Sequence, residues 1–207
     1  MSNSNMGSHL ASPSKPTSSK RGKIIVLVSP SGGGKSTMKD RLMSDFPAMK
    51  FSVSATTRAP RPGEIDGEHY HFLSEAQFDE ALEEGKFLEW EQVFSGTRYG
   101  TLRDSVDELL QKGYFVLFDV DVNGAHSLKS AFEDDALVLY LRPPSMEVLK
   151  ERLLERGTES SHDIEQRLQR AQKEMLEALT FDATILNDDL EEAYKEVYEV
   201  VGAFINV

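Results

Sequence analysis

The chain lacks cysteine entirely, and this absence excludes disulfide bonds, thiolate metal sites and cysteine nucleophiles. It also lacks any apolar stretch long enough to span a bilayer, so we expect no membrane partner. Basic residues are scarce: 23 lysines and arginines against 35 aspartates and glutamates leave a net charge of −12. So acidic a surface repels phosphate backbones, which argues against a nucleic-acid partner. With no secretory signal either, we expect a cytoplasmic protein.

Residues 1–22 differ in composition from the rest of the chain. They are rich in serine, asparagine and proline, and they have no apolar periodicity. Their charged residues (Lys15, Lys20 and Arg21) are all basic, so the remaining residues are more acidic still. We interpret this segment as a disordered N-terminal arm or tag that takes no part in the fold.

The sequence SPSGGGKST at residues 29–37 is the stretch around which the rest is organised. It follows the apolar run Ile24–Val28, so a strand, a glycine-rich turn and a helix start succeed one another as in a phosphate-binding P-loop. Consecutive glycines allow backbone N–H groups to converge on a polyphosphate. Lys35 would neutralise the β- and γ-phosphates, and the Ser36 hydroxyl would ligate Mg²⁺. Ser29 replaces the usual first glycine, and the alternative interpretation is a glycine-rich turn that binds nothing.

After this loop, helical and extended patterns alternate to the end of the chain. Strands alternating with helices predict an α/β fold in which helices cover both faces of a parallel sheet. Ser74 followed by Gln77 is a capping-box pattern and marks the start of one helix. We expect strands at 24–28, 51–54, 114–119, 136–141 and 183–186, and helices at about 35–46, 74–84, 101–111, 122–132, 145–155, 162–179 and from 189 onward.

Residues 55–100 interrupt this alternation with arginines, aromatic residues and several turn signals, and we expect an insertion folded beside the core. Within it, Arg58 and Arg61 are three residues apart and are stiffened by Pro60 and Pro62. Guanidinium groups bind phosphate oxygens in pairs, so these arginines suit a phosphate monoester. The alternative is an exposed loop with surface salt bridges.

Asp119-Val120-Asp121 follows a nearly continuous apolar strand. Ligands of open α/β sheets gather at the carboxyl ends of strands, so both carboxylates should face the P-loop. Asp119 would then hold Mg²⁺, directly or through water. For Asp121 the alternative is the N-cap of the following helix.

Together these motifs resemble the guanylate kinase family over essentially all of residues 23–207. The strings that carry the resemblance are SPSGGGKST at 29–37, SATTRAPRPGE at 54–64, DGEHYHF at 66–72, FLEW at 87–90, YGT at 99–101 and DVD at 119–121. It continues in Arg152-Leu153, in RGT at 156–158, in Arg167-Leu168 and in Asn187-Asp188. It departs between Glu89 and Tyr99, where this chain is one residue longer than the family pattern and has Arg98 where a second tyrosine is common.

The resemblance implies a GMP-binding half-site. The GMP phosphate would be held by Ser54, Arg58, Arg61, Tyr70 and Tyr99, and the guanine base would be read by Glu89, Thr101 and Asp121. Guanine offers N1–H and N2–H₂ donors beside an O6 acceptor, which suits a carboxylate next to a hydroxyl donor. Adenine has an acceptor at N1 and would leave that carboxylate unpaired. The alternatives are a strand-end acid for Glu89 and, for Trp90, simple core packing, which we favour.

The resemblance also implies an ATP-binding half-site formed by Ser31, Gly32, Gly33, Gly34, Lys35, Ser36, Thr37 and Asn187. The implied catalytic residues are Lys35, Arg58, Arg152, Arg156 and Arg167, and the implied Mg²⁺ ligands are Ser36 and Asp119. Arg152 and Arg156 are one helical turn apart and share a face, but both could equally pair with Glu151 and Glu155 in solvent.

The implied fold is a P-loop NTPase-type parallel sheet flanked by helices, with core segments 23–53, 102–154 and 167–207, a GMP-binding insertion at 54–101 and a lid at 155–166. The implied activity is Mg²⁺-dependent transfer of the γ-phosphoryl group of ATP to GMP by a monomer or weak homodimer. One alternative is a guanylate-kinase-like scaffold that binds phosphopeptides without catalysis. Another is a P-loop kinase for a different phosphorylated acceptor, such as a ribose phosphate, which would have no use for Glu89 and Thr101.

Overall fold

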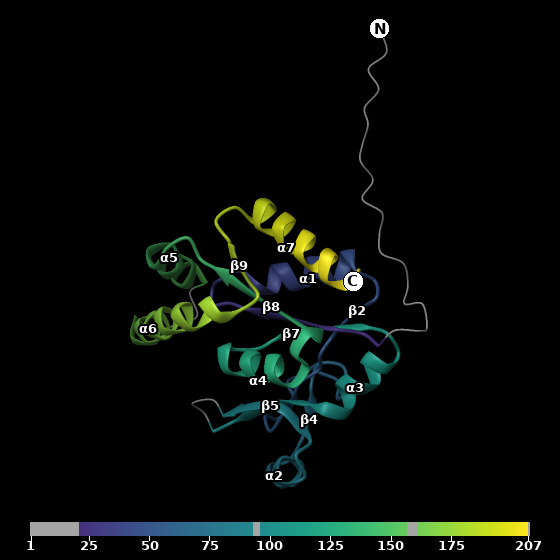
Figure 1. Ribbon diagram of the computed structural model, residues 1–207. Coiled ribbons are helices and arrows are strands. Elements are labelled where there is room, and N and C mark those ends of the chain that lie inside the picture. Colours follow the sequence, from purple (N-terminus) through teal and green to yellow (C-terminus); the bar gives the residue numbers. More distant parts are fainter. Residues whose placement is uncertain (1–20, 93–95, 157–160, 207) are drawn as a thin grey trace.

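The computed structural model describes residues 21–92, 96–156 and 161–206. Most of the N-terminal arm proposed at 1–22 and part of the lid proposed at 155–166 therefore lie outside the described residues. The elements below are drawn in Figure 1.

The main sheet is parallel throughout and has five strands in the order β2-β7-β1-β8-β9. These are β1 Ile24–Val28, β2 Met49–Phe51, β7 Phe115–Asp119, β8 Ala136–Arg142 and β9 Ala183–Leu186. All residues of β1 are buried, because β1 is the central strand and is covered on both faces. The predicted α/β class with a parallel sheet is confirmed.

Helices cover both faces of this sheet (Figure 1). Helices α1 Lys35–Asp45 and α7 Leu190–Ile205 lie on one face, and α3 Arg103–Gln111 and α4 Val122–Phe132 lie on the other. Alternate residues of β1 supply the two cores: Ile24, Val26 and Val28 pack with α3 and α4, whereas Ile25 and Leu27 pack with α1 and α7. Short 3₁₀ turns at Glu133–Asp135 and Ala178–Thr180 complete the connections.

Helices α5 Met146–Arg156 and α6 Ser161–Glu177 pack against each other beyond one end of the sheet. Leu149 and Leu153 of α5 meet Ile164 and Ala171 of α6 in a small apolar cluster of their own. This cluster holds α5 and α6 together. Polar side chains of the two helices, Arg152 and Arg167, reach the P-loop and its neighbour Asn187.

The insertion forms a second sheet in the order β4-β3-β6-β5, joined to one helix. Its elements are β3 Ala55–Thr56, β4 His71–Phe72, α2 Glu75–Glu83, β5 Phe87–Gln92 and β6 Arg98–Leu102. The capping box at the start of α2 is confirmed, because Ser74 and Gln77 exchange side-chain hydrogen bonds with each other's backbone. Strand β5 packs against α4, which attaches the insertion to the core.

Two sequence-based predictions are wrong here. Residues 51–54, expected as one strand, instead connect the two sheets. The chain leaves the main sheet at Ser52, whose N–H donates to the Leu117 carbonyl, and enters the second sheet at Ala55. Trp90 does not pack in a core. It is 48% exposed and meets the ring of Phe78 edge-on.

Within the described part of the chain, no helix combines the length and apolar character needed to cross a bilayer.

Candidate nucleotide-binding site

The glycine-rich loop lies between the central strand β1 and helix α1, in the order expected for a P-loop. Ser29, which stands at the first glycine of the usual pattern, is buried and causes no backbone strain. Among the described residues only Glu133 combines a side chain with a positive φ, so Ser29 adopts a conformation open to any residue. The loop is therefore compatible with this substitution.

Gly34 is the position where the loop needs glycine most. Its φ is +91°, and a Cβ there would lie 2.3 Å from the amide nitrogen of Asn187. The buried Asn187 donates from Nδ2 to the Gly33 carbonyl at 2.8 Å, and its own carbonyl accepts from Arg152 Nη2 at 3.1 Å. Asn187 and Arg152 therefore fix the loop from the side of β9 and α5.

Lys35 lies where two neighbouring strands end. Its Nζ is 2.6 Å from Asp119 Oδ1 and 3.4 Å from the carbonyl oxygen of Val120. Leu27 and Asp119 are register partners in the parallel pair of β1 and β7, which brings the P-loop lysine to the acid at the end of the next strand. Ser36 and Thr37 follow in the first turn of α1 and are exposed.

Helix α6 also contacts the P-loop. Arg167 donates from Nη1 to the Ser31 hydroxyl, so two of the predicted arginines, Arg152 and Arg167, adjoin the loop. The side chain of Arg156 lies outside the described part of the chain.

A second cluster forms around Arg58 in the insertion. Arg58 donates from both Nη atoms to Glu64, at 2.9 and 2.8 Å, and its guanidinium lies 5.2 Å from the centre of the Tyr70 ring. Glu64 also accepts from the Arg61 N–H at 2.6 Å. The hydrogen bond from Arg58, with the backbone bond from Arg61, lowers the pKa of Glu64 to about 2. The tyrosine rings of Tyr70 and Tyr99 meet edge-on at 6.0 Å.

The contacts of this cluster are internal to the insertion. Ser54 supplies a backbone carbonyl to His71, which pairs β3 with β4, and the side chain of Arg61 is exposed. Arg58, Arg61, Tyr70 and Tyr99 thus gather at one place in the second sheet, with a positive group held over aromatic faces.

Glu89 and Thr101 are direct cross-strand partners on β5 and β6. Thr101 is buried and donates its hydroxyl to Glu89 Oε1 at 2.6 Å. Burial raises the pKa of Glu89, and the nearby charge of Asp121 raises it further, while the Thr101 hydroxyl opposes the shift. Glu89 Oε2 lies 3.3 Å from where a Cβ of Gly124 would stand, so the absence of that carbon keeps the carboxylate accessible.

Asp121 is the N-cap of α4, as one of its two sequence-based interpretations predicted. Its Oδ1 accepts from the Gly124 N–H at 2.9 Å and caps α4, while its carboxylate also lies within electrostatic reach of Glu89. Its Oδ2 accepts from Arg170 on α6 at 2.8 Å. Arg170, Glu64 and Glu91 were not predicted from sequence as partners of site residues. Glu64 stands in the motif at 54–64, whereas no local pattern marks Glu91 or Arg170.

The two predicted half-sites therefore share the end of β7. Asp119 contacts the P-loop lysine, and Asp121, two residues later, adjoins the Glu89–Thr101 pair.

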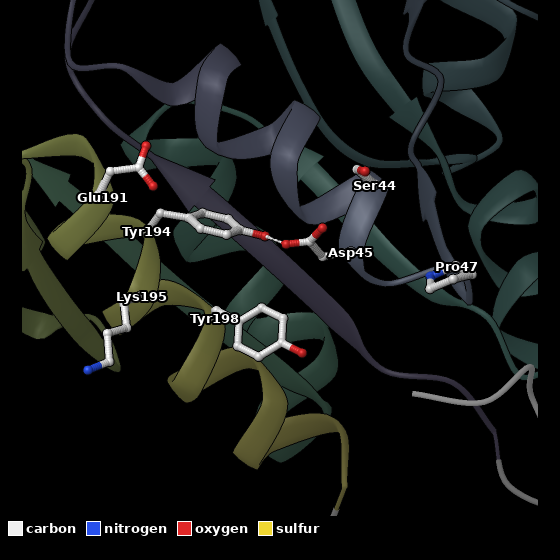
Figure 2. Close-up of a pocket in the computed structure, with 7 residues that line it drawn as sticks. All are labelled: Ser44, Asp45, Pro47, Glu191, Tyr194, Lys195 and Tyr198. Carbon is white, nitrogen blue, oxygen red and sulfur yellow. Dashed lines mark hydrogen bonds between the residues drawn. The ribbon is translucent and has the colours of Figure 1, made fainter. Parts of the chain in front are cut away.

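A separate hollow of about 470 Å³ lies between α1 and α7 (Figure 2). In Figure 2 the Tyr194 hydroxyl points at Asp45, with which it forms a 2.5 Å hydrogen bond, and Tyr198 lies beside it. None of the predicted site residues lines this hollow.

A parallel sheet with a central P-loop strand, and a P-loop lysine paired with the acid that ends the next strand, define a P-loop nucleotide-binding protein. Residues 21–204 match the family description "Guanylate kinase". The guanylate kinase of Chlorobium luteolum is 45% identical over 185 residues, which cover 89% of this chain and 93% of that protein. The guanylate kinase of Salinibacter ruber is 45% identical over 183 residues, covering 88% and 97%.

A solved structure agrees with these sequence relatives. The crystal structure of guanylate kinase from Anaplasma phagocytophilum superposes with a TM-score of 0.69 at 30% identity, covering 90% of this chain and 87% of that one. The chain belongs to the guanylate kinase family.

Proposed function

We propose that this chain transfers the γ-phosphoryl group of ATP to GMP, giving ADP and GDP. The family supports this reaction, and one observation carries its assignment to particular residues: the end of β7 lies between a P-loop lysine and a partly buried carboxylate–hydroxyl pair, Glu89 and Thr101. A donor triphosphate on Lys35 and an acceptor base on Glu89 would then lie on either side of Asp119–Asp121.

We assign the guanine base to Glu89, Thr101 and Asp121. The Glu89 carboxylate already accepts one hydrogen bond from Thr101 and retains lone pairs for the guanine N1–H and N2–H₂. Adenine would place an acceptor against this carboxylate and leave a partly buried charge unpaired, which costs orders of magnitude in kcat/KM.

We assign the GMP phosphate to Ser54, Arg58, Arg61, Tyr70 and Tyr99. Glu64 bonds to both Nη atoms of Arg58 and holds this guanidinium in place. A phosphate monoester would bind at the remaining N–H groups of Arg58, and the exposed Arg61 would add a second positive charge.

We assign the donor triphosphate to the P-loop. Its ligands would be Ser31, Gly32, Gly33, Gly34, Lys35, Ser36 and Thr37, with Asn187 holding the loop and Arg152, Arg156 and Arg167 spreading the charge of the transferring group. The helix α1 N-terminus adds partial positive charge at the same place.

The residues present fit a Mg²⁺ ion that is bound together with ATP. Within the described ranges there is no group of three or more acidic, histidine or cysteine side chains that could hold a metal alone. Mg²⁺ prefers one or two protein oxygens, several waters and substrate phosphates, and Ser36 and Asp119 offer such a pair. When bound, Mg²⁺ would neutralise the charge that develops on the phosphate oxygens.

The protein's own contribution to the reaction is alignment and charge neutralisation. Lys35 would hold the β- and γ-phosphates, Arg58 would aim the acceptor phosphate at the γ-phosphorus, and no general base is needed because that acceptor is already ionised. We propose that the insertion at 54–101 and the lid at 155–166 close over the core and exclude water.

We further propose that the chain acts as a monomer or weak homodimer in the cytoplasm, where both nucleotides are available.

A coupled assay of ADP release tests this function. With ATP and Mg²⁺ present, we expect ADP release to depend on added GMP, to stop when EDTA removes the metal and to resume when Mg²⁺ is restored. ADP release that does not depend on GMP would contradict the proposal, because it would mean ATP hydrolysis or another acceptor. No ADP release from folded protein would contradict it too, and would favour the scaffold interpretation.

A further inference from the structure

Arg170 on α6 reaches from the helix that touches the P-loop to the guanine half-site. Its Nη2 lies 2.8 Å from Asp121 Oδ2 and 3.5 Å from Glu91 Oε1, and its Nε lies 2.7 Å from Glu174 Oε1. One guanidinium therefore joins α6, the N-terminus of α4 and strand β5 of the insertion. Arg167, one helical turn earlier, contacts Ser31 of the P-loop.

The surroundings of Arg170 are unusually acidic. Glu89 and Glu91 on β5, Asp121 at the start of α4 and Glu174 on α6 all face this region. Burial raises the pKa of Glu91, the adjacent Asp121 raises it further, and Arg170 opposes both effects. Without a cation here, like charges on the core and on the insertion would repel each other.

Arg170 also completes the fixation of the Asp121 carboxylate. Oδ1 of Asp121 is held by the Gly124 N–H and Oδ2 by Arg170, so both oxygens have a fixed direction. Glu174 in turn holds the far side of the guanidinium and is only 15% exposed. A carboxylate held at both oxygens offers its remaining lone pairs in one orientation, which lowers the entropy lost on binding a ligand.

We propose that Arg170 is a positioning residue for the GMP site: it orients Asp121 and holds Glu91 beside it, so that guanine meets a preformed set of acceptors. This inference rests on the proposed function. The other arginines of α5 and α6 are assigned to the triphosphate. Arg170 would instead act on the acceptor nucleotide, and it would do so without contacting a phosphate.

A purely structural role makes a different prediction: it would lower the melting temperature and leave the KM for GMP unchanged. Arg170 is 50% exposed, but its closest partners, Asp121 and Glu174, are only 18% and 15% exposed. Replacing Arg170 should therefore lower the melting temperature through repulsion among the remaining carboxylates, and on our proposal it should also weaken GMP binding.

The test compares Arg170→Met and Arg170→Lys with Lys173→Met, which removes an exposed positive charge from the same helix. We expect Arg170→Met to raise the KM for GMP about tenfold, the scale of one lost charge-assisted hydrogen bond. The KM for ATP and kcat should change less than about twofold, and Arg170→Lys should recover part of the loss. Lys173→Met should match the wild type.

The double variant Arg170→Met/Glu91→Gln gives a second readout. Removing Glu91 also removes the uncompensated repulsion with Asp121, so we expect this variant to bind GMP better than Arg170→Met alone. Absence of any such recovery, or an unchanged KM for GMP in Arg170→Met, would overturn the inference. A wild-type protein that does not phosphorylate GMP would instead overturn the proposed function.

Discussion

At the scale of single residues, the pair formed by Lys35 and Asp119 lies at the half-site that we propose for the donor nucleotide. The Lys35 side chain is 20% exposed and its Nζ is 2.6 Å from the Asp119 carboxylate, in a position to exchange that partner for phosphate oxygens.

Lys35→Ala should lower kcat by about 10²-fold or more, because it removes a charge aimed at the transferring group. A coupled kinase assay measures this effect, and circular dichroism should show an unchanged fold. Near-normal turnover would remove Lys35 from the mechanism. Lys195→Ala, at the distant hollow of Figure 2, is the matched control.

Glu89, which we assign to the guanine base, has a cost in stability. Because burial raises its pKa in the folded state, its contribution to folding stability is fully present below the ordinary glutamate pKa of 4.5 and is lost as pH rises through the raised value. Glu89→Gln, which keeps an acceptor for Thr101, should therefore melt at a higher temperature at neutral pH and lose about 10²-fold or more in kcat/KM for GMP. Glu83→Gln, an exposed change on α2, should alter neither quantity. A fully active Glu89→Gln enzyme would contradict our assignment.

The same carboxylate gives the reaction a pH dependence. Only the ionised form of Glu89 can accept from both guanine donors, so the wild-type kcat/KM for GMP should fall as pH drops through its raised pKa. Glu64 does not contribute to this fall in kcat/KM. Its pKa is about 2, so the Arg58–Glu64 ion pair is lost only as pH falls toward that value. A pH–rate profile of Glu89→Gln that keeps the wild-type acidic limb would contradict this attribution.

The residues that sequence reasoning found and missed differ in a physical way. Lys35 and Asp121 were predicted from local patterns, a glycine-rich loop after a strand and a strand end before a helix, and Glu89 was predicted from the family resemblance. Glu91 and Arg170 were missed because their roles depend on how α6 packs against the core, and no local periodicity encodes that contact.

At the scale of elements, the loop from Arg58 to Glu64 is held in shape by its own ion pair. Glu64 accepts two hydrogen bonds from Arg58 and one from the Arg61 N–H. Glu64→Gln should loosen this loop and raise the KM for GMP about fivefold, with the KM for ATP unchanged, because a neutral amide binds a guanidinium more weakly. Steady-state kinetics with each nucleotide varied in turn measures this, and Glu68→Gln in the same exposed loop is the control. Equal KM values for GMP in the two variants would show that the Arg58–Glu64 ion pair does not affect GMP binding.

The P-loop is held by a hydrogen bond from the Asn187 side chain, which follows β9, to the Gly33 carbonyl. Asn187→Ala removes the bond to the Gly33 carbonyl and leaves a buried acceptor unpaired, a loss of about 1–3 kcal/mol in the free energy of unfolding. We also expect the KM for ATP to rise more than that for GMP, since the loop that holds the triphosphate loses its support. Asn206→Ala removes a similar amide-to-glycine bond on an exposed helix end and serves as the control. A rise confined to the KM for GMP would contradict this role.

Helices and buried strands were predicted closely from sequence, because caps and apolar runs act locally: the capping box at Ser74 and the strand Ile24–Val28 both appear as expected. The second sheet was not predicted. Strands β3 and β4 have two residues each, too few to show an alternating pattern, and the alternation at 51–54 belongs to a crossing between sheets.

At the scale of the whole molecule, an acidic protein binds two anionic nucleotides by concentrating its positive charge. The chain carries a net charge of −12, yet Lys35, Arg152 and Arg167 gather at the P-loop and Arg58 lies in the insertion, each fixed by a neighbouring acid, carbonyl or hydroxyl. On our assignment the two half-sites meet at the end of β7, which would favour transfer between two bound nucleotides rather than hydrolysis of one.

The most direct measurement is the kcat/KM of the wild-type chain for GMP, dGMP, AMP, CMP and UMP, with ATP and Mg²⁺ held constant. We predict that GMP exceeds AMP by several orders of magnitude, because adenine leaves the Glu89 carboxylate unpaired. A chain that phosphorylates AMP as well as or better than GMP would contradict the assignment of Glu89 and Thr101 to guanine.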